Sequence, residues 1–148
     1  MNTSTHALID YLLRSHNILS LATVRPDGYP QATTVGYVHD GLTVYVGVAD
    51  DSQKVQNIRH CDKVSLTIAR DEPDWNRIRG LSMGATAALV GDPAEIARVG
   101  ELMTAKFPQL QYLPKTELAG VVLLRITPKV ISLLDYTQGF GHTELIEI

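Results

Sequence analysis

The chain has 148 residues, of which 45% are hydrophobic and 20% are charged, and its formal net charge is -3. This size and composition suit a single domain, residues 1–148, with its own hydrophobic core. The chain has no run of Lys or Arg, which argues against nucleic acid as a partner, and no segment stays apolar for the length of a membrane span. Because the N-terminus also lacks the basic and apolar regions of a signal peptide, we expect a cytoplasmic protein with no membrane attachment.

The first part of the chain predicts one helix followed by β-hairpins. Leu8, Leu12 and Leu13 fall close to one helical face, which predicts a short helix that ends near Arg14. Turn residues, PDG and later HDG, then separate runs of β-branched and apolar residues, as in consecutive hairpins. The predicted strands are Ile18–Val24, Pro30–Val38 and Leu42–Val48.

The rest of the chain alternates short helices with further strands. SQKVQNIRH predicts a second helix, and Asp92 and Pro93 predict the start of a third that ends near Phe107. Pro128 separates the last two strand candidates, because a proline cannot donate to a strand ladder. The predicted strands are Lys63–Ala69, Arg77–Val90, Val121–Thr127 and Val130–Tyr136. Six or more short strands with few helices favour a small closed or split antiparallel barrel.

The stretch VADDSQKVQNIRH joins a strand directly to a helix start and allows two interpretations. In the first, Ser52 caps the helix and Lys54 is solvated. In the second, the hydroxyl, the ammonium and the free N–H groups of the first turn bind a phosphate. Asp50 and Asp51 oppose the second interpretation, since carboxylates repel an anion.

The segment TQGFGH, near the C-terminus, places two glycines around an aromatic residue and ends in a histidine. Such glycines allow close backbone approach, so Phe140 and His142 could contact a planar ligand, although a plain turn fits the same pattern. The histidines show no metal-ligand spacing, and Cys61 is the only cysteine, so we expect no metal site.

The order of these pieces resembles the pyridoxamine 5'-phosphate oxidase-like family of flavin-binding split barrels over nearly the whole chain. The PDGYP turn and the spacing within SQKVQNIRHCDKVSL are the most diagnostic parts. The resemblance implies a mainly β fold, a six-stranded antiparallel split β-barrel with short flanking helices. It also implies a homodimer that binds FMN in clefts between the two subunits.

The resemblance assigns site residues as well. Ser52, Gln53 and Lys54 match the family's phosphate-binding segment, and Arg79 matches a residue that reaches FMN from the other subunit. The segment with Phe140 and His142 resembles the family's closing segment beside the flavin ring, and His142 is the candidate proton donor. The residues that match segments along the ring are Thr33, Thr34, Val35, Val48 and Ala49.

These assignments predict an FMN-dependent oxidoreductase that acts on a small molecule and takes electrons from a donor such as NADH or NADPH. Three alternatives remain open because similar barrels serve other purposes. They are a deazaflavin-dependent reductase, a haem-binding or haem-utilisation protein, and a non-catalytic flavin-binding stress protein.

Overall fold

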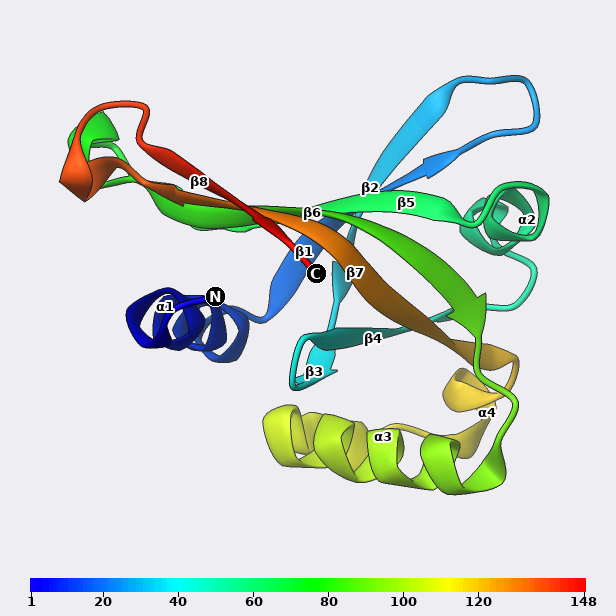
Figure 1. Cartoon of the computed structure of the whole chain (residues 1–148). Coiled ribbons are helices and arrows are strands. Elements are labelled where there is room, and N and C mark those ends of the chain that lie inside the picture. Colours follow the sequence, from blue (N-terminus) through cyan, green and yellow to red (C-terminus); the bar gives the residue numbers. More distant parts are fainter.

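The computed structural model describes residues 1–148 as one antiparallel sheet with short helices around it (Figure 1). The sheet has eight strands. Seven follow the order β2-β1-β5-β6-β7-β4-β3, and β8 pairs with the second half of β7, on the same edge whose first half pairs with β4. The strands are β1 (Ile18–Val24), β2 (Pro30–Gly36), β3 (Val38–Asp40), β4 (Thr43–Ala49), β5 (Lys63–Ala69), β6 (Arg79–Leu89), β7 (Val121–Asp135) and β8 (Thr143–Glu147). The helices are α1 (Thr3–Ser15), α2 (Gln53–His60), α3 (Pro93–Lys106) and α4 (Lys115–Leu118), with 3-10 turns η1 (Trp75–Arg77), η2 (Pro108–Tyr112) and η3 (Tyr136–Gln138).

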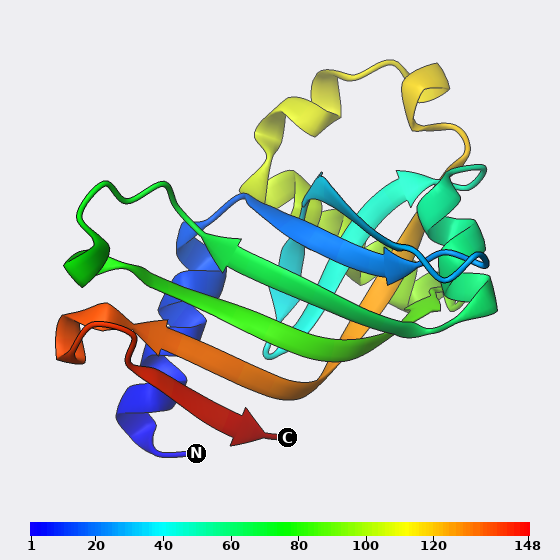
Figure 2. The same ribbon diagram turned by 90° about the horizontal axis from the view of Figure 1, so that it is seen from above.

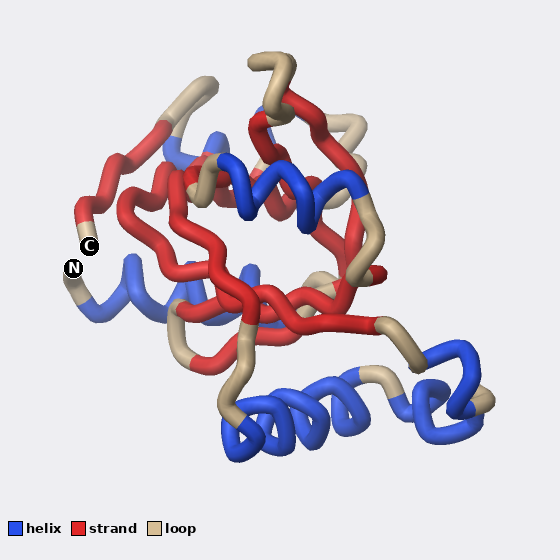
Figure 3. The backbone as a smooth tube through the Cα atoms, turned by 90° about the vertical axis from the view of Figure 1, so that its right-hand side faces the viewer, coloured by secondary structure: helices blue, strands red, loops and turns tan.

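The sheet curls strongly, and its concave side holds the core (Figures 2 and 3). The strands turn alternate residues toward this core: in β5, Val64, Leu66 and Ile68 are buried, and the residues between them are exposed. Six strands have at least seven residues and form the body, whereas β3 and β8 are short additions. This architecture confirms the predicted mainly β split barrel with short flanking helices.

The helices cover the openings and one outer side of this barrel. In Figure 3, which looks along the barrel, α2 crosses the near opening, α1 lies behind the far one, and α3 lies against the outside. Ile9 of α1 and Val55 of α2 belong to the central core. Glu95 anchors α3 by accepting two hydrogen bonds from Arg125 and one from Tyr45, and these contacts lower the pKa of Glu95 to about 2. None of the helices has the length and apolarity needed to cross a bilayer.

Tyr37 interrupts the strand that the sequence predicts from Pro30 to Val38. Its side chain is fully buried, and its hydroxyl donates to the carbonyl oxygen of Leu13 at 2.5 Å. The Lys106 ammonium lies 3.8 Å from the centre of the same ring, on the side of α3. The chain therefore breaks between β2 and β3 to place one aromatic side chain between α1 and α3.

Two strand predictions near the C-terminus are wrong. Pro128 does not separate two strands, because β7 continues through it to Asp135. The proline is tolerated because it lies at a bulge against Gly84 and Ala85 of β6, and on the other edge of β7 between the stretches that pair with β4 and β8. The sequence also leaves Thr143–Glu147 without a strand, although these residues form β8 along β7.

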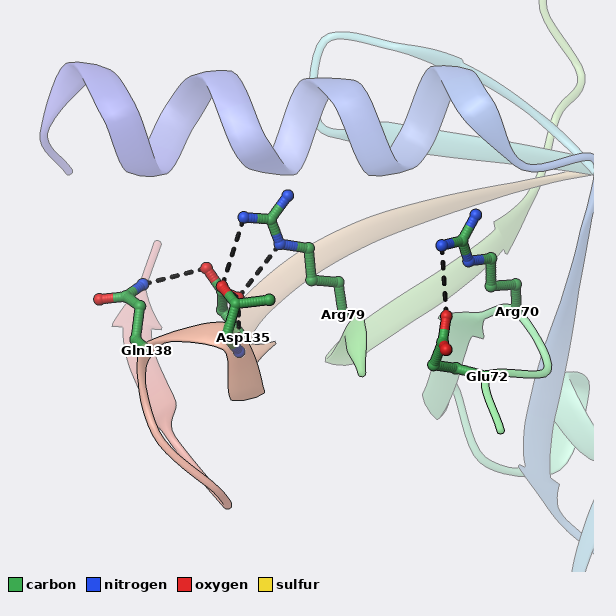
Figure 4. A network of polar contacts seen from close by, with 6 residues as sticks. Arg70, Glu72, Arg79, Asp135 and Gln138 are labelled. Carbon is green, nitrogen blue, oxygen red and sulfur yellow. Dashed lines mark hydrogen bonds and ion pairs between the residues drawn. The ribbon is translucent and has the colours of Figure 1, made fainter. Parts of the chain in front are cut away.

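A network of hydrogen bonds fixes the end of the sheet where β6 begins and β7 ends (Figure 4). The Asp135 carboxylate is buried and accepts hydrogen bonds from Arg79 at 3.1 Å, from Gln138 at 3.1 Å, and from both the backbone and the hydroxyl of Thr137. Burial alone would raise the pKa of Asp135, but the bonds from Thr137, Gln138 and Arg79 outweigh it and lower the pKa to about 2.

This lowered pKa predicts a pH-dependent contribution to stability. The folded protein holds the Asp135 pKa at about 2, below its ordinary value of 3.8, so the network stabilises the fold above pH 4 and loses this effect as the pH falls through 2. We expect Asp135→Asn to lower the free energy of unfolding by about 2 kcal/mol at pH 7, and by less at pH 2.5. Urea denaturation at both pH values measures this difference.

The matched control is Asp71→Asn, which neutralises an exposed acid near the same end of the sheet. We expect its stability to remain within about 0.5 kcal/mol of the wild type at both pH values. An Asp135→Asn protein that is equally destabilised at pH 7 and at pH 2.5 would show that ionisation of this carboxyl does not stabilise the fold.

Candidate functional site

The first turn of α2 presents hydrogen-bond donors that the protein itself does not use. Ser52 occupies the N-cap position in an extended conformation, yet its side chain makes no capping hydrogen bond. Its Oγ atom is buried and has no partner at all. The first backbone N–H groups of any helix also lack partners within the helix. Ser52 is therefore the N-cap residue by position, as the first interpretation predicts, but its hydroxyl does not cap the helix and stays free for an anion.

The side chains beside Ser52 differ in their freedom. Lys54 is partly buried and forms no ion pair, whereas the Gln53 amide donates to Asn57 at 2.9 Å. Asp50 and Asp51 are both exposed at the end of β4, and the Asp50 backbone N–H donates to Gly120. The local charge near the helix start thus combines one free ammonium with two solvated carboxylates.

Asn57 is a residue of this region that the sequence analysis missed. It is fully buried, and its amide donates to Thr23 at 2.9 Å and to Gln31 at 3.0 Å while it accepts from Gln53. These bonds hold α2 against β1 and β2. A polar residue on the buried face of a helix is the one sequence signal that could have identified it.

The strand β2 lies at the edge of the sheet, contacts β4, and is joined to α2 by the hydrogen bond from Asn57 to Gln31. Gln31, Thr33 and Val35 share its partly buried face, and the Oγ1 atom of Thr33 is buried without a partner. Thr34 points to the opposite face, where it lines a small pocket with residues of β1 and β5. An edge strand also keeps backbone N–H and C=O groups free, so β2 can offer hydrogen bonds to a ligand.

The end of β4 completes this region. Val48 is buried in the central core, whereas Ala49 is exposed and accepts the backbone hydrogen bond of Ser52 at 3.1 Å. Together, β2, the end of β4 and the start of α2 place two unpartnered hydroxyls and one unpaired ammonium in the same part of the fold. We call this region the α2 site; its side-chain contributors are Thr33, Val35, Ala49, Ser52 and Lys54.

The other predicted site residues lie at the β6–β7 end of the sheet, where β6 begins and β7 ends. Phe140 is 69% exposed and stacks on Trp75, with 6.5 Å between ring centres. His142 is exposed, and its carbonyl oxygen accepts the backbone N–H of Asp135. Gly139 and Gly141 have positive φ angles of 143° and 82°, which allow the tight turn that carries Phe140.

Figures 1 and 2 place this turn and α2 at opposite ends of the sheet. The seven-residue strand β5 lies between them, and six steps along a strand span roughly 20 Å. Arg79, Phe140 and His142 therefore do not meet Ser52 and Lys54 around one small ligand within a single chain. The structure brings together only part of the predicted set.

Comparisons with known proteins agree with this fold. No curated protein matches the sequence significantly. A putative pyridoxamine 5'-phosphate oxidase from Listeria innocua is similar in structure, with a TM-score of 0.72 and 24% identity over 88% of this chain and 98% of that one. A heme-binding protein from Mycobacterium smegmatis has a TM-score of 0.81 and 17% identity, with 99% of this chain and 59% of that one covered.

A third similar structure is a Clostridium acetobutylicum protein related to general stress protein 26, of the pyridoxinephosphate oxidase family. Its TM-score is 0.74 and its identity 17%, with 100% of this chain and 97% of that one covered. At these identities the similarities establish the fold alone. The family model described as pyridoxamine 5'-phosphate oxidase matches residues 5–135 and so covers most of the barrel, which shows that the chain belongs to the pyridoxamine 5'-phosphate oxidase family.

Proposed function

We propose that the protein is an FMN-binding oxidoreductase of this family that acts on a small molecule. The observation that carries the proposal is the buried Ser52 hydroxyl, which has no partner in the protein and lies at the open first turn of α2. A buried hydroxyl without a hydrogen bond costs free energy, so a ligand that satisfies it is favoured. A phosphate group suits the position because it accepts hydrogen bonds and carries negative charge.

The residues of the α2 site fit the parts of FMN. Ser52 and the first N–H groups of α2 would donate to the phosphate, and Lys54 would pair with its charge. The Gln53 amide already bonds to Asn57, so its part is to hold the helix start in place. Thr33 and the free edge of β2 would donate to and accept from the polar rim of the flavin ring, with Val35, Val48 and Ala49 as apolar neighbours.

The flavin supplies the hydride chemistry when it is bound, and the protein supplies binding, orientation and exclusion of water. His142 is the candidate for holding a proton, because an imidazole nitrogen can accept or donate one. Its side chain is exposed and forms no hydrogen bond within the chain. A donor such as NADH or NADPH would reduce the flavin.

A homodimer would unite the two halves of the predicted site. Arg79, Phe140 and His142 lie at one end of the sheet, and the α2 site lies at the other. A second copy placed with its β6–β7 end over the α2 site of the first would close a cleft that each chain leaves open. The exposed pair of Trp75 and Phe140 supports this arrangement, since large exposed aromatic side chains are typical of interfaces.

Haem is the second candidate ligand. The Mycobacterium smegmatis neighbour is described as a heme-binding protein, and a Vibrio cholerae neighbour as a heme storage protein. In this chain His142 would be the iron ligand, because its side chain is exposed and makes no hydrogen bond within the chain. A deazaflavin reductase and a flavin carrier without catalytic activity are the remaining alternatives.

The absorption spectrum of the purified protein tests the cofactor. We expect the protein, after incubation with FMN and desalting, to retain the two-band spectrum of oxidised flavin and to lose it when NADH or NADPH is added under anaerobic conditions. A flavin spectrum that neither nucleotide bleaches would indicate a carrier. A sharp Soret band in freshly purified protein would favour haem instead, and a protein that releases all added FMN would contradict the proposal.

Substitution of Lys54 tests the phosphate assignment. We expect Lys54→Ala to weaken FMN binding by about 1–3 kcal/mol, because the variant loses a charge-assisted contact to the phosphate. Quenching of flavin fluorescence measures the dissociation constant. Lys129→Ala is the matched control, since Lys129 is exposed on β7, and it should bind FMN as the wild type does. Equal affinity in Lys54→Ala and Lys129→Ala would remove Lys54 from the site.

A further inference from the structure

A pocket of about 220 Å³ lies between α1 and the loop that joins β5 to β6, at the end of the sheet opposite α2. Figure 4 shows Arg70 and Arg79 on this side of the sheet, beneath α1. The pocket is large enough for a phosphate or a small carboxylate together with a few waters, since one water occupies about 30 Å³ in the liquid. Its lining residues are Tyr11, Leu12, Ser15, His16, Arg70, Arg77 and Arg79.

Positive charge dominates this lining. Three of the seven residues are arginines and none is acidic. Glu72 pairs with Arg70 at 3.3 Å, and Asp135 pairs with Arg79 at 3.1 Å. Arg77 has no carboxylate partner, so one guanidinium remains uncompensated.

The paired arginines also keep free hydrogen-bond donors. A guanidinium has five N–H groups. Arg70 uses Nη2 for Glu72, and Arg79 uses Nε and Nη2 for Asp135 and Thr137. Because guanidinium groups bind carboxylates and phosphates in a bidentate manner, three of them around one pocket favour an anion with several oxygens.

The walls of the pocket are held before any ligand binds. Leu12 and its neighbour Leu13 are buried in the core and fix the C-terminal turn of α1. His16 makes a 2.9 Å hydrogen bond between its Nδ1 atom and the carbonyl oxygen of Leu12, which leaves Nε2 available. The Asp135 network fixes Arg79 on the opposite side. A preorganised pocket loses less free energy on binding than a mobile one.

We propose that this pocket binds the anionic group of the substrate, a phosphate ester or a dicarboxylate. The inference deepens the proposed function and rests on it, because it takes the substrate to be the molecule that exchanges electrons with the flavin. The pocket is separate from the α2 site in each chain, at the other end of β5. In the proposed dimer, the β6–β7 end of one subunit covers the α2 site of the other, which would hold the anionic group near the flavin ring.

The test uses two probes, inorganic phosphate and succinate, and isothermal titration of the FMN-loaded full-length protein. We expect one probe to bind the wild type with clear preference, which identifies the substrate class as a phosphate ester or a dicarboxylate. Arg77→Gln should bind that probe at least about tenfold more weakly, because it lacks the uncompensated guanidinium. Its FMN affinity should equal that of the wild type.

Lys115→Gln is the control for net charge, since it removes one exposed cation on α4, and it should bind the probe as the wild type does. Equal losses of probe affinity in Arg77→Gln and Lys115→Gln, or no binding of either probe, would overturn the inference. The proposal of FMN binding would be unaffected, because the absorption spectrum tests it separately. An Arg77→Gln protein that loses FMN as strongly as Lys54→Ala would also overturn it, because the pocket would then serve the flavin phosphate. If the probe binds in a manner that depends on Arg77 but the protein retains no FMN, the anion pocket would be supported and the proposed FMN binding would be refuted.

Discussion

The hydrogen bond from the buried Tyr37 hydroxyl to the Leu13 carbonyl joins the parts of the chain on which both sites depend. Leu13 lies in the last turn of α1, which forms one wall of the pocket lined by Arg70, Arg77 and Arg79, the arginine pocket. Tyr37 follows β2, which borders the α2 site. Lys106 of α3 contacts the same ring from the outside of the barrel, and burial raises the pKa of the Tyr37 hydroxyl. One buried side chain therefore sets the position of a helix and of an edge strand.

Buried polar side chains differ in whether their hydrogen bonds are satisfied within the chain. Asn57, Glu95 and Asp135 each meet several hydrogen-bond partners, and each holds one element against the sheet. The hydroxyls of Ser52 and Thr33 are buried with no partner. The Nζ atom of Lys106 also lacks a hydrogen bond, but it lies over the Tyr37 ring. Since proteins pair nearly all buried polar groups, the two orphaned hydroxyls, which have no such contact, mark the region of Ser52 and Thr33. This contrast makes the start of α2 a binding site in our proposal and the Asp135 network a support.

The sequence predicts most strands, and it predicts β1 and β5 to the residue, because their apolar residues alternate and turn residues bound them. The misplaced boundary at Pro128 has a tertiary cause: a proline fits within β7 only because a bulge and a change of neighbouring strand coincide there. Ser52 and Lys54 could be selected from their place between strand and helix. The sequence could not predict that the Ser52 hydroxyl stays unpaired, since this depends on how neighbouring elements bury it. The sequence could not predict the arginine pocket either, because α1 supplies its second wall from far earlier in the chain.

The separation of the two regions along β5 also bears on how such proteins diverge. The loop between β5 and β6 carries Arg70 and Arg77 and contributes nothing to the α2 site of its own chain, so it can change in length and charge while the bonds around Asn57 stay intact. Selection can thus act on the loop without disturbing the helix start. A protein built on this barrel can therefore vary the loop end of the sheet without altering the contacts that hold the proposed α2 site.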